Sequence, residues 1–115
     1  MDFYHYTSNE GLNAIVQSGY IQPSTLEGAD AFFGEGVYGT SLPPSVGKRK
    51  LAENNWGGLW KQHEDAGKVD HAIYLKIPGD KLIQAKSDRD IYIYKGKLVL
   101  KDYPGWKTYD LDDFK

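Results

Sequence analysis

The aromatic and β-branched residues of this chain occur in short runs, and glycine or proline lies at or near one end of most of these runs. Runs of this composition with such boundaries predict short β-strands. Strands are expected over residues 3–6, 36–40, 71–77, 91–94, 97–100 and 106–109. Because Lys95-Gly96 offers a tight turn between two of these runs, 91–94 and 97–100 are expected to form a β-hairpin. The pattern predicts a strand-rich, mostly antiparallel α+β domain.

One clear helix is expected directly after the first predicted strand. The hydroxyls of Thr7 and Ser8 can cap its amino terminus, and Glu10 follows Thr7 at the spacing of a capping box. Gly19 stands where a left-handed residue would end the helix. The apolar stripe of this helix is expected to consist of Leu12, Ile15 and Val16. An irregular helix is also allowed over 45–62, although a glycine pair within it should interrupt it.

The composition indicates a single domain spanning residues 1–115. A chain of 115 residues with 40% hydrophobic content can bury one compact core. Fourteen basic and sixteen acidic residues give a net charge of −2, which excludes a global basic field that would hold a nucleic-acid backbone. Because the chain has no cysteine, a disulfide framework, a thiolate nucleophile and a zinc–thiolate site are also excluded.

The hydropathy pattern predicts no membrane partner. No apolar run approaches the ~20 residues that are needed to span a bilayer. The first residues also lack the basic and apolar regions of a signal peptide. We therefore expect a cytoplasmic place of action, or delivery into the cytoplasm of a target cell as an effector.

Several common site motifs fail on inspection. Residues 34–39 read G-x-G-x-x-G, but Pro43 and Pro44 follow where a dinucleotide-binding helix would have to continue. Residues 46–49 lack the Ser or Thr and the first glycine of a P-loop. The histidines lie far apart without H-x-x-x-H spacing, so no metal site is expected. No serine stands in a G-x-S-x-G turn, although scattered residues can still converge into a hydrolase triad.

Three aromatic-rich segments remain, and each supplies a different chemical group. Tyr4-His5-Tyr6-Thr7 carries an imidazole beside small polar groups. Phe33-Gly34-Glu35-Gly36-Val37-Tyr38 presents aromatic rings around two glycines, and Asp90-Ile91-Tyr92-Ile93-Tyr94 opens an apolar strand with a carboxylate. In this order the segments resemble the ADP-ribosyltransferase superfamily, in the His-Tyr-acid group that includes poly(ADP-ribose) polymerases and diphtheria toxin. The chain is similar in particular to a small, largely bacterial family named for a His-Tyr-Asp signature and often found as toxin domains.

The resemblance implies a split, mostly antiparallel β-sandwich of the ADP-ribosyltransferase type that holds NAD in a cleft. His5 would bond a ribose hydroxyl on the adenosine side of NAD, and Tyr38 would stack on the nicotinamide. Asp90 would face the positive charge that develops on the ribose when the nicotinamide bond breaks. The further NAD contacts that the resemblance implies are Tyr6, Thr7, Phe33, Gly34 and Gly36. The basic run Lys48-Arg49-Lys50 is expected to meet the pyrophosphate.

The chain departs from the family pattern in three respects. Asp90 stands where many members have Glu, and its shorter stem changes the reach of the carboxylate. No second tyrosine follows Tyr38 at the usual distance, so the other wall of the nicotinamide site is unassigned. Asp88-Arg89-Asp90 replaces the Glu-x-Glu or Gln-x-Glu pair, and arginine-directed transfer therefore loses its usual signature.

Three functions fit these observations. The first is an NAD-dependent mono-ADP-ribosyltransferase with an unknown protein, nucleic-acid or small-molecule acceptor. The second is an NAD glycohydrolase, in which water is the acceptor. The third is an inactive domain that binds a nucleotide or a partner protein, because His5 and Tyr38 taken singly are typical of sheet packing and Asp90 of a strand start.

Overall fold

The computed structural model describes residues 1–24, 34–85 and 88–114. Five short 3₁₀ turns connect the regular elements of this part of the chain. The helices and strands, in chain order, are β1 (Asp2–Thr7), α1 (Asn9–Ser18), β2 (Tyr20–Ile21), β3 (Val37–Gly39), α2 (Lys48–Trp56), α3 (Trp60–Asp65), β4 (His71–Lys76), β5 (Leu82–Gln84), β6 (Tyr92–Tyr94), β7 (Leu98–Val99) and β8 (Lys107–Asp110).

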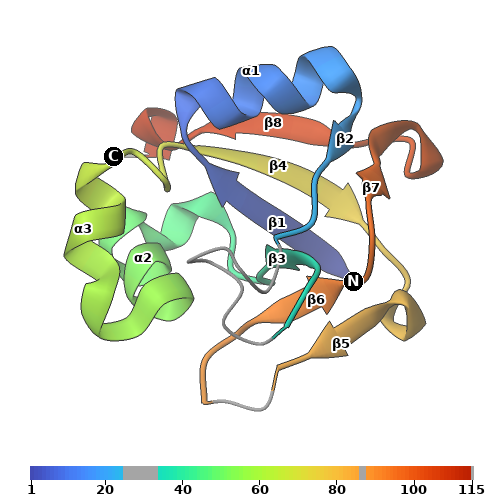
Figure 1. The fold of residues 1–115 in the computed structure, drawn as a ribbon. Helices are drawn as coiled ribbons and strands as arrows, with labels where there is room; N and C mark the ends of the chain where they lie inside the picture. Colours follow the sequence, from blue (N-terminus) through green and yellow to red (C-terminus); the bar gives the residue numbers. More distant parts are fainter. Residues whose placement is uncertain (25–33, 86–87, 115) are drawn as a thin grey trace.

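The strands form two three-stranded sheets and one two-stranded ribbon (Figure 1). The first sheet has the order β1-β4-β8 and the second β3-β6-β5, while β2 pairs with β7. Every strand pair of the described chain is antiparallel. The fold is therefore α+β with mostly antiparallel sheets, as predicted.

A single bridge between Tyr4 and Thr40 joins the two larger sheets. Each of these residues donates its backbone N–H to the carbonyl of the other, with N···O distances of 2.8 and 3.0 Å. The next residue back, Gly39, lies so close to the ring of Phe3 that a Cβ placed on it would lie 2.3 Å from Phe3 Cζ. Glycine is therefore required where β3 crosses β1.

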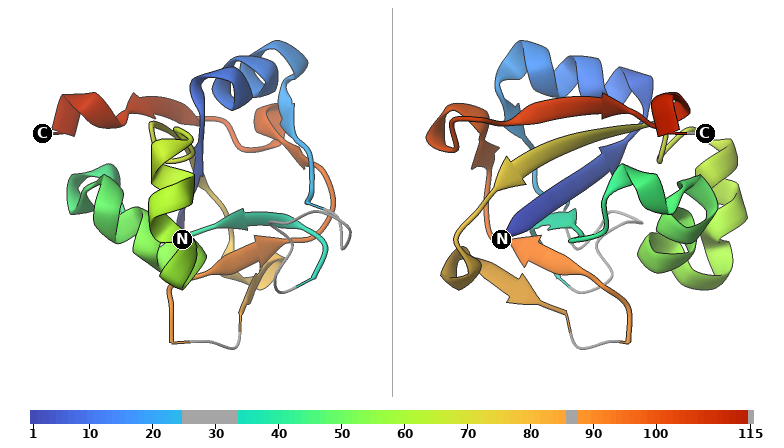
Figure 2. Two further views of the ribbon diagram at one scale, coloured as in Figure 1. Left: turned by 60° about the vertical axis from the view of Figure 1, so that its left-hand side comes forward. Right: turned by 180° about the vertical axis from the view of Figure 1, so that it is seen from behind.

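The two faces of the β1-β4-β8 sheet bury different cores. Successive strand residues point to opposite faces. Phe3 and Ile73 join the larger core with Ile15 of α1, whereas Tyr6 and Ala72 join a second core beneath α2 and α3. The helix α1 thus covers one face of the sheet and α2 with α3 the other (Figure 2).

The signals at both ends of α1 give the predicted boundaries. The Ser8 hydroxyl caps the helix by accepting from the Gly11 amide at 3.1 Å, and Gly19 ends it with a φ of 82°. The expected apolar stripe is wrong at Val16, which is 47% exposed, whereas Ile15 is buried in the core and Leu12 packs against it. A helix was expected over part of 45–62, and α2 and α3 fill this region with a 3₁₀ turn between them at the glycine pair. Residues 1–24, 34–85 and 88–114 thus contain two α-helices besides the N-terminal one.

The predicted hairpin about Lys95-Gly96 is wrong. Gly96 does turn the chain, with a φ of 83°. However, β6 already lies between β3 and β5, so both of its edges are occupied. The following segment crosses to β2 instead, where Leu98 and Val99 pair with Ile21 and Tyr20.

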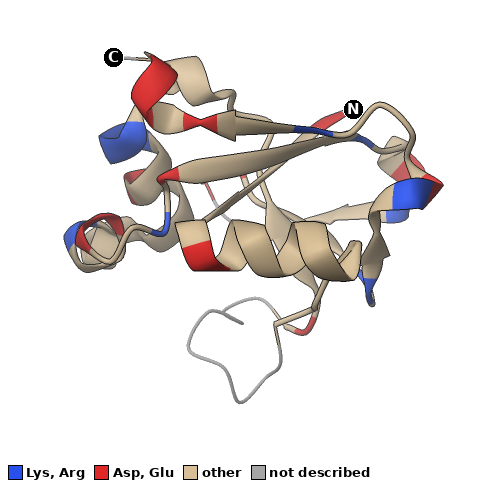
Figure 3. Cartoon of the chain, turned by 90° about the horizontal axis from the view of Figure 1, so that it is seen from above, with Lys and Arg blue, Asp and Glu red and all other residues tan. Residues whose placement is uncertain are grey.

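Basic and acidic residues are interspersed, and neither sign of charge is concentrated on one face of the molecule in Figure 3. Segments that carry Lys or Arg lie next to segments that carry Asp or Glu at both ends of the view in Figure 3. Lys48, for example, lies 2.9 Å from Asp70 and 3.1 Å from Asp112. Within the described ranges, no helix is long and apolar enough to cross a membrane.

Candidate functional site

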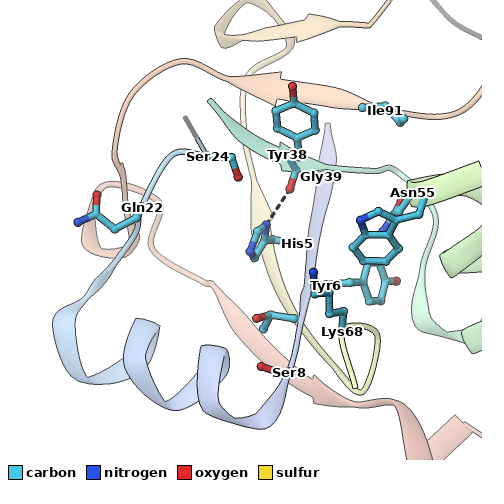
Figure 4. Close-up of a pocket in the computed structure, with 12 residues that line it drawn as sticks. His5, Tyr6, Ser8, Gln22, Ser24, Tyr38, Gly39, Asn55, Lys68 and Ile91 are labelled. Carbon is cyan, nitrogen blue, oxygen red and sulfur yellow. Dashed lines mark hydrogen bonds between the residues drawn. The ribbon is translucent and has the colours of Figure 1, made fainter. Parts of the chain in front are cut away.

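A cavity with a volume of about 270 Å³ lies where the end of β1 meets β3. Its walls come from the turn between β1 and α1, the segment after β2, β3, the end of α2 and the loop before β4. Figure 4 shows Gln22 and Ser24 on one side of His5 and Asn55 on the other. The lining residues are His5, Tyr6, Thr7, Ser8, Gln22, Ser24, Tyr38, Gly39, Asn55, Trp56, Lys68 and Ile91.

A hydrogen bond at this cavity joins the first two sequence segments. His5 Nδ1 lies 2.7 Å from the carbonyl oxygen of Tyr38 (Figure 4). Because a carbonyl only accepts, the Nδ1 atom carries the hydrogen and donates it. In the neutral imidazole the Nε2 atom is then the acceptor, so His5 can receive a hydrogen bond from a hydroxyl group.

Tyr38 contributes its backbone to the contact with His5, while its ring points away from His5 in Figure 4. The phenol donates to the carbonyl of Gly34 at 2.6 Å. The Tyr38 side chain also packs against a small apolar cluster formed by Ala85, Ile91 and Ile93. This side chain is therefore held by the cluster and by the bond from its hydroxyl.

Tyr6 and Thr7 also line the cavity, but the Tyr6 side chain has a structural role. It is 6% exposed, and its hydroxyl donates to the Leu42 carbonyl at 2.7 Å. Burial raises the pKa of the Tyr6 phenol. The Thr7 hydroxyl lies so near Gly11 that a Cβ there would be 2.0 Å from it, so the first turn of α1 packs directly on the strand end.

The two glycines of the second segment do not line the cavity. Gly36 has a φ of 155°, and a Cβ on it would lie 2.4 Å from Ile93 Cγ2 and 2.9 Å from the Tyr94 carbonyl oxygen. This glycine is thus explained by the close approach of the chain to β6. Gly34 provides the carbonyl that accepts from Tyr38. Phe33, the remaining residue predicted for this segment, lies outside the described residues.

Asp90 is not part of the cavity wall, although the next residue, Ile91, is. Its Oδ1 atom accepts from the Thr40 hydroxyl at 2.9 Å and from the Ser41 amide at 2.8 Å. Its Oδ2 atom accepts from the Ser41 hydroxyl. The carboxylate is therefore held against the residues that follow β3, at the edge of the cavity.

The basic run 48–50, for which a contact with the pyrophosphate is expected, is not among the residues that line the cavity. Lys48 bridges the carboxylates of Asp70 and Asp112, and the hydrogen bond that it donates to Asp70 is the main reason that the pKa of Lys48 is raised. Arg49 contacts Glu53 at 3.2 Å. Among the residues that the structure describes, the lysine that lines the cavity is Lys68, which precedes β4.

Sequence reasoning missed the aromatic wall contributed by α2. Trp56 lines the cavity, and its ring stacks on His63 with a centroid distance of 4.4 Å and an interplanar angle of 9°. The Nζ atom of Lys68 lies 5.9 Å from the centroid of the same ring. The sequence offered only the presence of tryptophans after Tyr38, and this signal does not distinguish Trp56 from Trp60.

The residues that surround Asp90 were also missed. Asn54 contacts its backbone, and Thr40 and Ser41 contact its carboxylate. All three are common polar residues without a motif of their own. In the part of the chain that the structure describes, no group of three or more His, Cys, Asp and Glu residues could hold a metal ion.

Comparison with known proteins adds one match. A family model described as a HYD1 signature containing ADP-ribosyltransferase matches residues 3–101, and this range includes all three motif segments. No curated protein and no solved structure matches the chain significantly. Since the family model spans most of the 115 residues, the chain belongs to the toxin-associated family of ADP-ribosyltransferases that contain a HYD1 signature.

Proposed function

We propose that the chain is an NAD-dependent mono-ADP-ribosyltransferase and that the cavity beside His5 binds the nicotinamide end of NAD. Membership of the family supports the general reaction. The observation that carries the assignment is the bond from His5 to the Tyr38 carbonyl, because it brings the first two motif segments to one cavity. The two larger sheets, joined at Tyr4 and Thr40, would be the halves of the split sandwich.

The size of the cavity fits part of a dinucleotide. Its volume of about 270 Å³ lies just below the range of about 300–1000 Å³ that is usual for ligand pockets. A more open groove of about 370 Å³ runs along α1 and shares His5 and Gln22 with the cavity. NAD would place its nicotinamide and ribose in the cavity and continue past His5 into this groove.

The reaction breaks the bond between the ribose C1′ atom and the nicotinamide nitrogen. The bonding electron pair leaves with nicotinamide, and positive charge develops on the ribose. A nucleophile of the acceptor then bonds C1′ and loses its proton. His5 Nε2 would accept from a ribose hydroxyl, and the ring of Trp56 or Tyr38 would contact the flat nicotinamide.

Asp90 supplies the negative charge in this proposal. Its carboxylate lies at the edge of the cavity and is acceptor-only when ionised, so it can face the cationic ribose or bond a ribose hydroxyl. Thr40 and Ser41 would hold it in place until the substrate arrives. A cytoplasmic place of action, or delivery into the cytoplasm of a target cell as an effector, remains our prediction for where this reaction occurs.

A second candidate is a domain that binds a nucleotide without cleaving it. The observation that favours it is that Thr40 and Ser41 already donate three hydrogen bonds to the Asp90 carboxylate, and that Asp90 is not among the residues of the cavity wall. An NAD glycohydrolase would use the same residues with water as the acceptor. Free ADP-ribose formed without an added acceptor would identify it.

The test is nicotinamide release from NAD, with NAD binding measured by calorimetry on the same samples. Asp90→Asn keeps the shape of the side chain and removes its charge. The control is Asp113→Asn, which changes an exposed carboxylate of the C-terminal 3₁₀ turn. We expect Asp90→Asn to bind NAD and release nicotinamide at least about 100-fold more slowly than wild type, whereas the control matches wild type. Binding of NAD by the wild type without nicotinamide release would support the binding domain instead.

A further inference from the structure

Asn54 of α2 contacts both backbone polar groups of Asp90, its N–H and its carbonyl. Its Oδ1 atom accepts from the Asp90 amide at 2.7 Å, and its Nδ2 atom donates to the Asp90 carbonyl at 2.7 Å. A backbone amide only donates and a carbonyl only accepts, so these partners determine the orientation of the Asn54 amide. One side chain thus makes the pair of bonds that a neighbouring β-strand would make.

The same amide also reaches the residues that hold the Asp90 carboxylate. Asn54 Nδ2 lies 3.4 Å from the Thr40 hydroxyl, which itself donates to Asp90 Oδ1 at 2.9 Å. Thr40 is fully buried, and its hydroxyl additionally accepts from the Leu42 amide at 3.2 Å. Backbone and carboxylate of Asp90 are therefore held by one connected network.

The helix that carries Asn54 is firmly anchored. Leu51 and Ala52, within one turn of Asn54, are fully buried in the core that contains Tyr6 and Val69. The position of the Asn54 amide is consequently set by the packing of α2 on the β1-β4-β8 sheet. By contrast, Asp90 precedes β6 and lies outside any described strand or helix.

We propose that Asn54 is a positioning residue that holds Asp90 at the entrance of β6, so that its carboxylate stays aligned with Thr40 and Ser41 at the edge of the cavity. This inference rests on the proposed function, in which Asp90 is the carboxylate that faces the ribose. Asn54 itself does not line the cavity, so it acts through Asp90. Displacement of a reacting group by about 1 Å can lower a rate about 100-fold.

Two variants test this role. Asn54→Ala removes both bonds to the Asp90 backbone. Asn54→Asp has the same shape and keeps an acceptor for the Asp90 amide, but it has no N–H to donate to the Asp90 carbonyl. The control is Asn13→Ala, which removes an exposed asparagine of α1 outside the cavity.

Amide hydrogen exchange gives a readout that does not depend on catalysis. Because Asn54 holds Asp90 and the Ser41 amide donates to the Asp90 carboxylate, we expect Asn54→Ala to accelerate exchange at the amides of both residues by about tenfold or more. Amides in the centre of β4 should keep their wild-type exchange rates. Wild-type exchange at Asp90 and Ser41 in both Asn54 variants would overturn the proposal, whether or not the protein cleaves NAD.

Steady-state kinetics of nicotinamide release gives the second readout. We expect Asn54→Ala to lower kcat by about 10- to 100-fold with a change in KM of less than about threefold, because the bonds affect the alignment of Asp90 rather than the cavity wall. Asn54→Asp should lower kcat at least as much as Asn54→Ala, because its second carboxylate oxygen would face the Asp90 carbonyl oxygen without a hydrogen to donate. A rise in KM at constant kcat would overturn the positioning role. Absence of release by the wild type would refute the proposed function instead, and the exchange data would then decide the role of Asn54 alone.

Discussion

Replacing His5 by asparagine separates the two roles that the structure gives to this side chain. The Nδ2 atom of asparagine occupies nearly the place of His Nδ1, so His5→Asn can keep the donor to the Tyr38 carbonyl at 2.7 Å. It removes the Nε2 atom, which would accept from a ribose hydroxyl. His5→Ala removes both groups.

The expected changes in stability follow from that one bond. A hydrogen bond of this kind contributes about 0.5–1.5 kcal/mol net, and the Tyr38 carbonyl lines a cavity that water can enter. His5→Ala should therefore lower the free energy of unfolding by about 1 kcal/mol, or the Tm by roughly 4 °C. His5→Asn should remain within about 0.5 kcal/mol of wild type.

The expected changes in activity differ from those in stability. Both variants lose the acceptor for the ribose hydroxyl, so both should lower kcat/KM for nicotinamide release by about tenfold. His71→Asn is the matched control, since His71 lies on β4 and does not line the cavity. Thermal unfolding and nicotinamide release would be measured on the same preparations. Wild-type kcat/KM in His5→Asn would refute the assignment of Nε2 to a substrate hydroxyl.

Three further perturbations test other parts of the account. Gly39→Ala places a Cβ 2.3 Å from Phe3 Cζ, which belongs to a fully buried ring. Denaturant unfolding should therefore show that the free energy of unfolding falls by about 1–3 kcal/mol. The control Gly58→Ala has no atom within 4 Å of its Cβ and should not show this loss. Tyr6→Phe removes the bond to Leu42 and should cost about 1–2 kcal/mol in the same assay. Burial raises the pKa of the Tyr6 phenol above the unfolded value of 10.0. The protonated phenol therefore stabilises the fold fully below pH 10, and this contribution is lost as the pH rises further. Because Tyr6→Phe has no phenol to ionise, it should lose less stability above pH 10 than wild type does. Lys68→Met should weaken NAD binding in calorimetry, because Lys68 lines the cavity. The control Lys48→Met should leave NAD binding unchanged and lower the free energy of unfolding by less than about 1 kcal/mol, because Lys48 contacts partly exposed carboxylates away from the cavity.

Local signals predicted the elements that depend on neighbouring residues. Ser8 and Gly19 gave the ends of α1 because capping and a left-handed residue act within one turn. The strands around Tyr4, Tyr38 and Ile73 followed from residue types and their boundaries. The composition of a segment is sufficient for such elements.

Pairing between distant segments was not accessible in the same way. Leu98 and Val99 pair with Ile21 and Tyr20, some 80 residues earlier, and a turn signal at Gly96 cannot indicate this. A hairpin is the simplest solution for two adjacent strands, but the occupied edges of β6 exclude it here. The error thus arose from sheet order rather than from strand assignment.

The site was predicted in part for a similar reason. His5, Tyr6, Thr7 and Tyr38 carry recognisable motifs, and the structure brings them to one cavity. Asn54 lies 36 residues from Asp90 in a helix that carries no motif, and only the packing of α2 places the two together. Asp90 itself was selected by its place before an apolar strand, but the direction of its carboxylate depends on Thr40 and Ser41.

The most direct test of the central claim is a series of ¹H–¹⁵N correlation spectra of the wild type during addition of NAD, with the nicotinamide signals followed in the same sample. The account predicts shifts at the amides of Thr7, Gly39 and Ile91, which line the cavity, together with the appearance of free nicotinamide. Intact NAD without these shifts would contradict the claim that this cavity binds and cleaves the dinucleotide.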